Sequence, residues 1–326
     1  MKIYRKYLLL PVCFSLFFGL NGSLADQKKS VPPADKAVFG KAQLTGRLGD
    51  DRLVECSGMD TSLAAGNLIW AINDNGNGPF IYALRIDGRS MGRVFVIGAQ
   101  NRDWEGLDTF FWQGRPMILI ADFGDNHEQY DTHTLYIVEE PKLEAERYSE
   151  TSAVKLAWRI VFSYPDHKHD AESVSVDAAG GKVLILTKRD NPPLLFELPL
   201  IPPHYPIVAK KAGAVRQIPP PSDEDLLQKY GKYRSQPTAL DLSPDGRQAV
   251  VLTYKHAYLF NRESHDSWAA ALSGQPQTVH LPLPQDRSDF RQREAICFVA
   301  GSGTLLITSE GHGAGIFRLE ISNPTN

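Results

Sequence analysis

The stretch WEGLDTF, residues 104–110, recurs in altered form along this chain of 326 residues, and its recurrence decides the fold. Each copy contains a polar or acidic residue, then a small one, then alternating apolar residues. The other four copies are CSGMDTS at 56–62, AESVSVD at 171–177, PTALDLS at 237–243 and REAICFV at 293–299. Five copies of one short pattern, spaced by 48 to 67 residues, indicate an internal structural repeat.

Each copy leads into a turn and then a second run of β-forming residues, as in a tight hairpin. The second runs are NLIWAIND, PMILIAD, KVLILTK, QAVVLTY and TLLITSE. The polar residue of each copy lies 16 or 17 residues before the end of its second run, so antiparallel strands of equal length return to one level. A third strand follows in every repeat, and a fourth follows in four of the five.

These features predict an all-β protein with the architecture of a β-propeller. We expect five four-stranded antiparallel blades, with six blades as the alternative that the residue count allows, in a single domain over residues 37–323. The last repeat ends before its fourth strand. The segment AVFGKAQLTG, residues 37–46, belongs to no repeat and is expected to supply that strand, which would close the ring and leave no exposed sheet edge. One insertion, SDEDLLQKYG at 222–231, is expected to contain a short helix.

The first 25 residues have the pattern of a secretory signal peptide. Lys2, Arg5 and Lys6 precede the apolar run at 7–20, and small residues lead to a cleavage site after Ala25. Residues 26–36 are expected to form a flexible N-terminal segment. No later run approaches the ~20 apolar residues of a spanning helix. We therefore expect an exported monomer, periplasmic or secreted, with no membrane span.

Charge and cysteine content narrow the chemistry further. Loss of residues 1–25 removes three positive charges and no negative ones, so the net charge falls from −3 to about −6, which disfavours nucleic acid as a partner. Cys56 and Cys297 lie on innermost strands four positions out of step. At ~3.3 Å per residue that offset is ~13 Å, too long for a disulfide, so two buried thiols are expected.

Acidic residues gather where the innermost strands start and the second strands return, at one mouth of the central channel. Two unit charges 4 Å apart cost about 4 kcal/mol at an effective dielectric of 20, so a positive charge must balance them. One hypothesis is a hard cation, with Ca²⁺ favoured as cofactor. Its candidate ligands are Asp103, Glu105, Asp122, Asp170, Glu172, Glu294 and Glu310.

Basic and aromatic residues lie at the same mouth and are candidates for binding a small anionic molecule or a glycan. They are Lys188, Arg189, Tyr254, Lys255, Arg293 and Trp104. The alternative, of equal weight, is that these cations simply pair with the carboxylates and lock neighbouring blades together. Trp104 can likewise pack between blades.

The motif DHKHDAE, residues 166–172, contains the densest local set of possible metal ligands. His167 and His169, with Asp170 and Glu172, have side chains that bind transition metals. The simpler interpretation is a solvated loop between blades, because two histidines in one loop are a loose signal.

The ordered motif set RDWEGLD, IADFGDN, YPDHKHDAESVSVD, LTKRDN, TALDLSPDGRQAVVLTY and EAICF with TSEG resembles that of a family of exported bacterial β-propeller proteins. That family lies near the phytase-like and gluconolactonase-like (regucalcin-like) propellers. The resemblance covers roughly residues 50–320 and implies a propeller fold and export. Likeness to the phytase-like group also implies a phosphate held on a metal beside Lys and Arg.

Three functions stay open from the sequence. The first is a protein that binds a ligand and a metal ion at the channel mouth. The second is a metal-dependent hydrolase of a phosphoester, a lactone or another ester, with catalytic residues unknown. The third is a non-catalytic scaffold for a protein or a glycan. No G-x-S-x-G, H-E-x-x-H, Walker or C-x-x-C motif is present.

Overall fold

The structure is a computed structural model that describes residues 36–142, 147–203, 206–282 and 292–322. The described residues belong to one compact unit, Lys36–Asn326. The predicted signal peptide, and the segment after it up to residue 35, lie outside the described residues. Among those that are described, no helix is long and apolar enough to cross a membrane.

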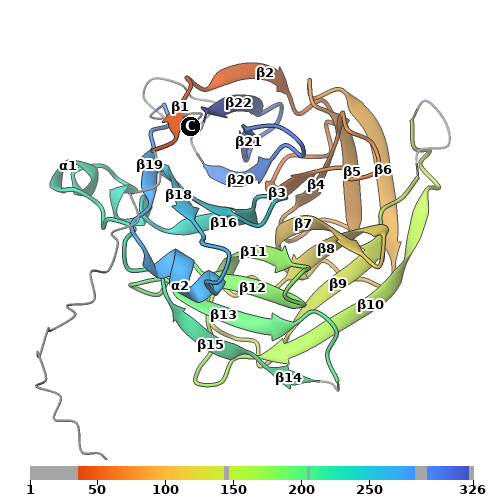
Figure 1. Cartoon of the computed structure of the whole chain (residues 1–326). Coiled ribbons are helices and arrows are strands. Elements are labelled where there is room, and N and C mark those ends of the chain that lie inside the picture. The colour runs from red at the N-terminus through yellow and green to blue at the C-terminus, as the bar shows by residue number, and fades with distance from the viewer. Residues whose placement is uncertain (1–35, 143–146, 204–205, 283–291, 323–326) are drawn as a thin grey trace, which may run out of the picture. The chain divides into compact units, whose positions relative to one another are not determined.

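The described chain is all-β, and its sheets surround a common centre as in a β-propeller (Figure 1). Five strands line that centre and coincide with the five copies of the repeat. They are β3 (Cys56–Thr61), β7 (Trp104–Trp112), β11 (Ala171–Asp177), β16 (Pro237–Leu242) and β20 (Arg293–Phe298). Each contacts the next in that order, and β20 contacts β3, so the contacts run in a closed cycle.

Further strands continue outward from each innermost strand by antiparallel pairing. From β3 these are β4 (Leu68–Asn73), β5 (Phe80–Arg85) and β6 (Ser90–Ile97); from β7, β8 (Arg115–Asp122), β9 (His133–Glu139) and β10 (Ala153–Ser163); from β11, β12 (Lys182–Thr187), β13 (Leu194–Pro199) and β15 (Lys210–Ala214); from β16, β17 (Gln248–Thr253), β18 (Ala257–Asn261) and β19 (Gln277–Val279); from β20, β21 (Thr304–Ser309) and β22 (Gly315–Ser322). The predicted hairpins and third strands are confirmed.

The outer strands depart from the prediction in two places. β6 and β10 pair in parallel at their ends, which joins the sheets of β3 and β7 into one nine-stranded sheet. The single outer strand predicted over 206–215 is divided, because β14 (Ile207–Val208) pairs with β10 in parallel while β15 pairs with β13. The chain therefore bridges two sheets before it completes the second of them.

The N-terminal segment completes the last sheet. β2 (Gln43–Arg47) pairs antiparallel with β22, and so does the short β1 (Val38–Phe39). The predicted pairing of residues 37–46 with the last repeat is confirmed. Since β22 belongs to the other end of the chain, the two ends of the described chain share one sheet.

A β-bulge occurs at the same position in every innermost strand. The register with the outward neighbour shifts between Cys56 and Gly58 in β3, and at the equivalent place in the other four strands. The bulged residues are Ser57, Glu105, Glu172, Thr238 and Glu294. A bulge re-aims the side chain of its extra residue.

Small residues follow each bulge because the innermost strands approach one another closely. A Cβ at Gly58 would lie 2.8 Å from the backbone nitrogen of Leu107, and one at Gly106 would lie 2.7 Å from Cγ1 of Val174. The equivalent residues elsewhere are Ser173, Ala239 and Ala295. The small residue in each repeat therefore permits the packing around the channel.

The apolar core lies between adjacent sheets, and both cysteines are part of it. Cys56 on β3 and Cys297 on β20 belong to one buried cluster, and both are free thiols. The prediction of two buried thiols is confirmed. Burial raises the pKa of Cys56 to about 12, so this thiol is inert at neutral pH.

Helical structure is confined to short insertions. α1 (Asp223–Leu226) confirms the helix predicted in 222–231, and Ser222 caps it through a capping box with Asp225. The turn η1 (Gly231–Tyr233) follows it, and α2 (Trp268–Ser273) precedes β19.

Candidate functional site

The five bulged side chains serve two different purposes. The Ser57 hydroxyl donates to the backbone oxygen of Trp104 at 2.6 Å, and the Thr238 hydroxyl donates to that of Arg293 at 2.7 Å. Both bonds reach the next innermost strand and hold it in register. The bulged glutamates Glu105, Glu172 and Glu294 instead belong to an acidic group at one mouth of the channel.

We call this group the mouth cluster; it consists of Lys188 and the carboxyl groups of Asp74, Asp103, Glu105, Glu172, Glu294 and Glu310. Its tightest part is Asp74, Asp103 and Glu105, each of which offers a carboxylate oxygen within 4.8 Å of the other two. The structure thus confirms the proximity of Asp103 and Glu105 and adds Asp74.

Gly124 presses against the same carboxylates. A Cβ at this position would lie 2.5 Å from Oδ2 of Asp103 and 2.8 Å from Cγ of Glu105. The glycine of the FGDN stretch therefore leaves the room in which Asp103 and Glu105 approach each other.

Lys188 supplies positive charge to the mouth cluster. Its buried ammonium group pairs with Oε1 of Glu172 and lies 5.3 Å from the centre of the Tyr254 ring. The charge of Lys188 also acts to lower the pKa of Glu105, Glu294 and Glu310. One ammonium group cannot neutralise six carboxylates.

The acids of the mouth cluster consequently hold protons at neutral pH. Burial, with neighbouring carboxylates, raises the pKa of Asp74 to about 7 and that of Glu294 to about 8. Burial and the charge of Asp74 raise the pKa of Glu105 well above its ordinary value. Protons thus occupy positions that a cation would otherwise compensate.

Two predicted metal ligands have other roles. Oδ1 of Asp122 accepts hydrogen bonds from the backbone N–H groups of Asp103, at 2.8 Å, and Arg102, at 3.1 Å. Oδ1 of Asp170 accepts from the N–H of Asp125 at 3.0 Å, and its Oδ2 pairs with Arg189 at 2.7 Å. The prediction that Asp122 and Asp170 are metal ligands was wrong, because their oxygens fix the loops of the mouth.

The bulge explains why Asp122 was assigned to the wrong level. Asp122 lies opposite Trp104, just as Asn73 lies opposite Cys56. Asn73, and not Asp74, is therefore its structural equivalent.

The predicted anion-binding residues do not form one group. Lys188 and Tyr254 lie together, but Lys255 pairs with Asp225 of the α1 insertion at 2.6 Å. Arg293 is fully buried and donates to the backbone oxygens of Tyr254, Lys255 and Pro282. Lys255 and Arg293 thus hold segments of the chain together, and their assignment to ligand binding was wrong.

Trp104 is not a stacking surface for a ligand. Its ring is fully buried against Tyr136, and its indole N–H donates to the backbone oxygen of Gln100 at 2.8 Å. The alternative that this tryptophan packs within the core holds instead.

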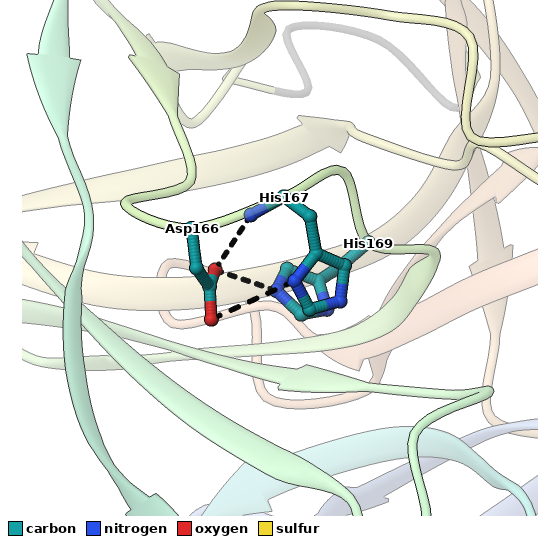
Figure 2. Close-up of side chains that lie close together, drawn as sticks. All are labelled: Asp166, His167 and His169. Carbon is teal, nitrogen blue, oxygen red and sulfur yellow. Dashed lines mark hydrogen bonds and ion pairs between the residues drawn. The ribbon is translucent and has the colours of Figure 1, made fainter.

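The DHKHDAE motif divides between two places. Asp170 and Glu172 turn to Arg189 and Lys188, as described above. Asp166, His167 and His169 gather at a separate position, where one ligand atom of each lies within 4.8 Å of the others (Figure 2). The predicted set of His167, His169, Asp170 and Glu172 is therefore not a single site.

A cavity of about 310 Å³ adjoins the mouth cluster. Asp103 borders both, and Asn75 donates to its Oδ1 at 2.9 Å. The guanidinium of Arg102 stacks on the Tyr130 ring at 3.8 Å from its centre. Residues that line the cavity include Asn75, Arg102, Asp103, Asn126, His127 and Tyr130. Sequence reasoning missed His127 and Tyr130 because they lie in a loop that no other repeat shares.

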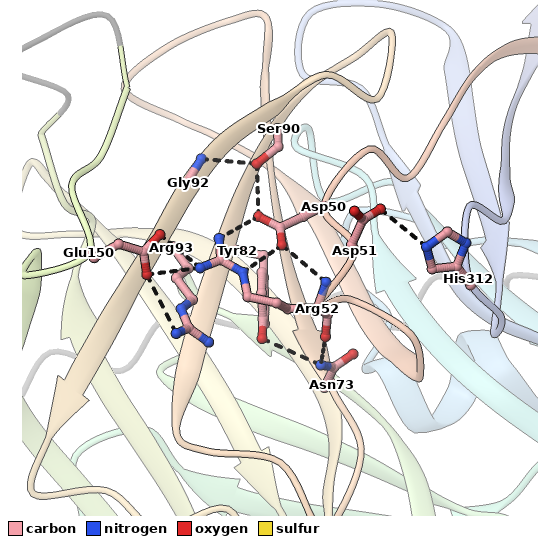
Figure 3. A network of polar contacts seen from close by, with 10 residues as sticks. All are labelled: Asp50, Asp51, Arg52, Asn73, Tyr82, Ser90, Gly92, Arg93, Glu150 and His312. Atoms are coloured by element: carbon pink, nitrogen blue, oxygen red, sulfur yellow. Dashed lines mark hydrogen bonds and ion pairs between the residues drawn. The ribbon is translucent and has the colours of Figure 1, made fainter.

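A polar network supports the backbone next to Asp74 (Figure 3). Asn73 donates through Nδ2 to the backbone oxygen of Arg52 at 2.7 Å. The Arg52 guanidinium pairs with both Asp50 and Glu150 at 2.8 Å. Although burial opposes it, hydrogen bonds from Arg52 and Ser90 lower the pKa of Asp50 to about 2. This network anchors the chain that precedes β3.

A second acidic layer, missed in the sequence, lies three residues beyond the bulges. Asp60, Asp108 and Asp241 are buried and offer oxygens within 4.8 Å of one another. Each accepts a backbone N–H of the next innermost strand: Thr109 at 2.6 Å, Val176 at 2.5 Å and Phe298 at 2.6 Å. The signal was visible, because an aspartate stands at this position in three of the five repeats. This layer registers neighbouring innermost strands.

Comparisons with known proteins are few. No protein-family model and no curated protein matches this chain. It is similar to a chain in the crystal structure of a nidogen–laminin complex, with 11% identity and a TM-score of 0.43 over 79% of this chain and 73% of that chain. It is also similar to Chaetomium thermophilum Raptor, with 12% identity and a TM-score of 0.42 over 88% of this chain and 29% of that chain. The predicted resemblance thus stands for a β-propeller-like fold, and no sequence family is identified.

Proposed function

We propose that this chain is an exported five-bladed propeller that binds a divalent cation, Ca²⁺ in the first place, and a small ligand at the mouth of its channel. The count of five rests on the closed cycle of contacts among β3, β7, β11, β16 and β20. Pairing of β2 with β22 supports closure of the ring by an N-terminal strand.

The division among the bulged residues carries the proposal. Ser57 and Thr238 bond to the next strand, and the aspartates of the second layer bond to backbone N–H groups. Glu105 and Glu294 make no such bond among the described residues, yet they are buried with like charges. Registration of the strands therefore does not account for them, whereas a cation does.

An oxygen without a partner supports the same conclusion. Oε2 of Glu172 is buried and has no hydrogen bond among the described residues. Glu172 and Glu105 border a narrow cavity of about 10 Å³ in the channel, room for about one water or a small ion. A buried carboxylate oxygen without a partner is costly, and binding a hard cation removes that cost.

The ligand is proposed to occupy the 310 Å³ cavity beside Asp103. Its walls offer amide groups, the Arg102 guanidinium stacked on Tyr130, and His127. This mixture suits a hydroxyl-rich or anionic small molecule, such as a glycan or a phosphorylated compound.

A metal-dependent hydrolase of a phosphoester or a lactone is the second candidate. The observation that favours it is the raised pKa of Glu105 and Glu294 beside the proposed cation. Such carboxyl groups exchange protons near neutral pH, as general acid–base catalysis requires, and the cation would lower the pKa of a bound water.

The test is the thermal midpoint of the mature protein, treated with a chelator and then titrated with Ca²⁺, Mg²⁺ or Zn²⁺. We expect Ca²⁺ to raise the midpoint by several degrees, since an ion at 100 times its Kd adds about 2.7 kcal/mol to the free energy of unfolding. The isosteric Glu105→Gln/Glu294→Gln variant should lose this rise. The exposed Glu263→Gln variant is the matched control and should keep it.

The outcomes separate the candidate functions. If no cation shifts the midpoint, the cation proposal fails and the mouth cluster is a protonated structural group. If Ca²⁺ binds, cation-dependent turnover of phosphoesters or lactones that is lost in Glu105→Gln would establish the hydrolase. Binding without turnover supports the ligand-binding protein.

A further inference from the structure

His169 is held in one orientation by groups on every side (Figure 2). Its side chain is 1% exposed, and its ring packs against Tyr164 and Phe196, with ring centres 4.8 and 5.1 Å away. Nδ1 lies 2.9 Å from Oδ2 of Asp190, and Nε2 lies 2.9 Å from Oδ1 of Asp166. An imidazole fixed in this way presents one chosen nitrogen to whatever lies next to it.

The contact with Asp190 has the form of a metal site's supporting bond. A histidine that binds a metal usually donates its other ring N–H to a carboxylate, which fixes the tautomer and strengthens the ligand. With the Nδ1 proton directed at Asp190, both Nε2 of His169 and Oδ1 of Asp166 present lone pairs to each other. Either a proton or a metal ion must join them.

A second imidazole lies at the same place. The rings of His167 and His169 have their centres 4.0 Å apart, and Nδ1 of His167 lies 3.8 Å from Oδ2 of Asp166. The His167 side chain is 60% exposed, so it can turn toward an incoming ion at little cost. Two imidazoles and a carboxylate are the ligands that Zn²⁺ prefers.

We propose that Asp166, His167 and His169 bind a transition-metal ion, Zn²⁺ in the first place, with Asp190 as the residue that positions His169. The site is separate from the mouth cluster, because Asp170 and Glu172 turn to Arg189 and Lys188 instead. Zn²⁺ with three protein ligands keeps a fourth position for water or for an oxygen of a small anion.

Lys211 bears on the charge of this site, since its Nζ lies 3.2 Å from Oδ2 of Asp166. The neighbouring Lys168 points elsewhere and pairs with Asp131 at 3.0 Å. The proposed ion would therefore share Asp166 with Lys211. Zn–N and Zn–O bonds of about 2.0–2.2 Å require the 2.9 Å separation between His169 and Asp166 to open slightly.

The test uses Co²⁺ as a coloured substitute for Zn²⁺ in the full mature protein after chelator treatment. We expect visible absorption of four-coordinate Co²⁺ that saturates at one ion per chain and is removed by added Zn²⁺. Asp166→Asn and His167→Ala should each weaken binding tenfold or more, as should Asp190→Asn, which changes only the positioning residue. The exposed His265→Ala is the matched control and should bind like the unchanged protein.

Two results would overturn the inference. One is the absence of Co²⁺ absorption and of micromolar Zn²⁺ binding in the unchanged protein. The other is an NMR spectrum in which His169 keeps a proton on both ring nitrogens in the presence of excess Zn²⁺, which would show a proton-bridged imidazolium. The Glu105→Gln/Glu294→Gln variant should retain Co²⁺ binding, so this test succeeds or fails independently of the proposed Ca²⁺ site.

Discussion

Binding of Ca²⁺ to the mouth cluster should release protons, and the number can be worked out from its carboxyl groups. At about pH 7, a group with a pKa of about 7, such as Asp74, is about half protonated, and one of about 8, such as Glu294, is about nine-tenths protonated. Glu105, whose pKa is also well raised, adds to this number. A cation that ionises these groups therefore displaces more than one proton per ion.

The assay is isothermal titration of the metal-free protein with Ca²⁺ at about pH 7, in buffers that differ in ionisation enthalpy. The slope of the observed heat against that enthalpy is the number of protons released. We expect a slope above one in the unchanged protein and a loss of up to about one proton in Glu294→Gln. At about pH 9, where Asp74 and Glu294 are already ionised, the slope should fall.

The same groups set the pH dependence of stability. The folded-state pKa values of Asp74 and Glu294 are raised, so the folded protein binds more protons than the unfolded chain between about pH 4 and pH 8. Stability without metal should therefore fall as pH rises through that window, and Ca²⁺ should restore it at the upper end. Equal heats in all buffers, together with a midpoint shift by Ca²⁺ that is as large at pH 5 as at pH 8, would refute this reasoning.

Three substitutions test other parts of the structure. Gly124→Ala should weaken Ca²⁺ binding at least tenfold in calorimetry, because its Cβ would overlap a site carboxylate, whereas Gly66→Ala meets no atom within 4 Å and should change nothing. Asp241→Ala should lower the free energy of unfolding by about 1–3 kcal/mol in a urea titration, because the N–H of Phe298 loses its partner, and should leave Ca²⁺ affinity unchanged. Lys188→Gln should bind Ca²⁺ more tightly, since a competing positive charge is removed; weaker binding would contradict a purely electrostatic role for Lys188.

The prediction of the mouth succeeded only where it did not depend on counting residues exactly. Asp103 and Glu105 do lie together, and the glutamates at the bulges do share one end of the channel. Asp122 fails because each bulge adds one residue to the inner strand, which moves the return strand by one level. Alternation of polar and apolar residues carries no signal for a single extra residue.

The partner of a long cation was also beyond the sequence. Lys188 and Lys255 stand at equivalent positions within one residue of each other, yet Lys188 reaches Glu172 and Lys255 reaches Asp225 in an insertion. Both side chains are long and flexible, so the nearest available carboxylate decides the pairing. That carboxylate comes from a segment remote in sequence.

The sequence by itself determined the all-β class, the five innermost strands, their hairpins and the N-terminal strand that pairs with β22, because turn residues and alternating polarity act over a few neighbouring residues. Only the tertiary structure decided which acids register strands and which form the mouth cluster. Asp60, Asp108 and Asp241 meet backbone N–H groups, while Glu105 and Glu294 meet one another. The difference lies in what the neighbouring strand presents at each level, and that depends on bulges and close packing between segments some fifty or more residues apart.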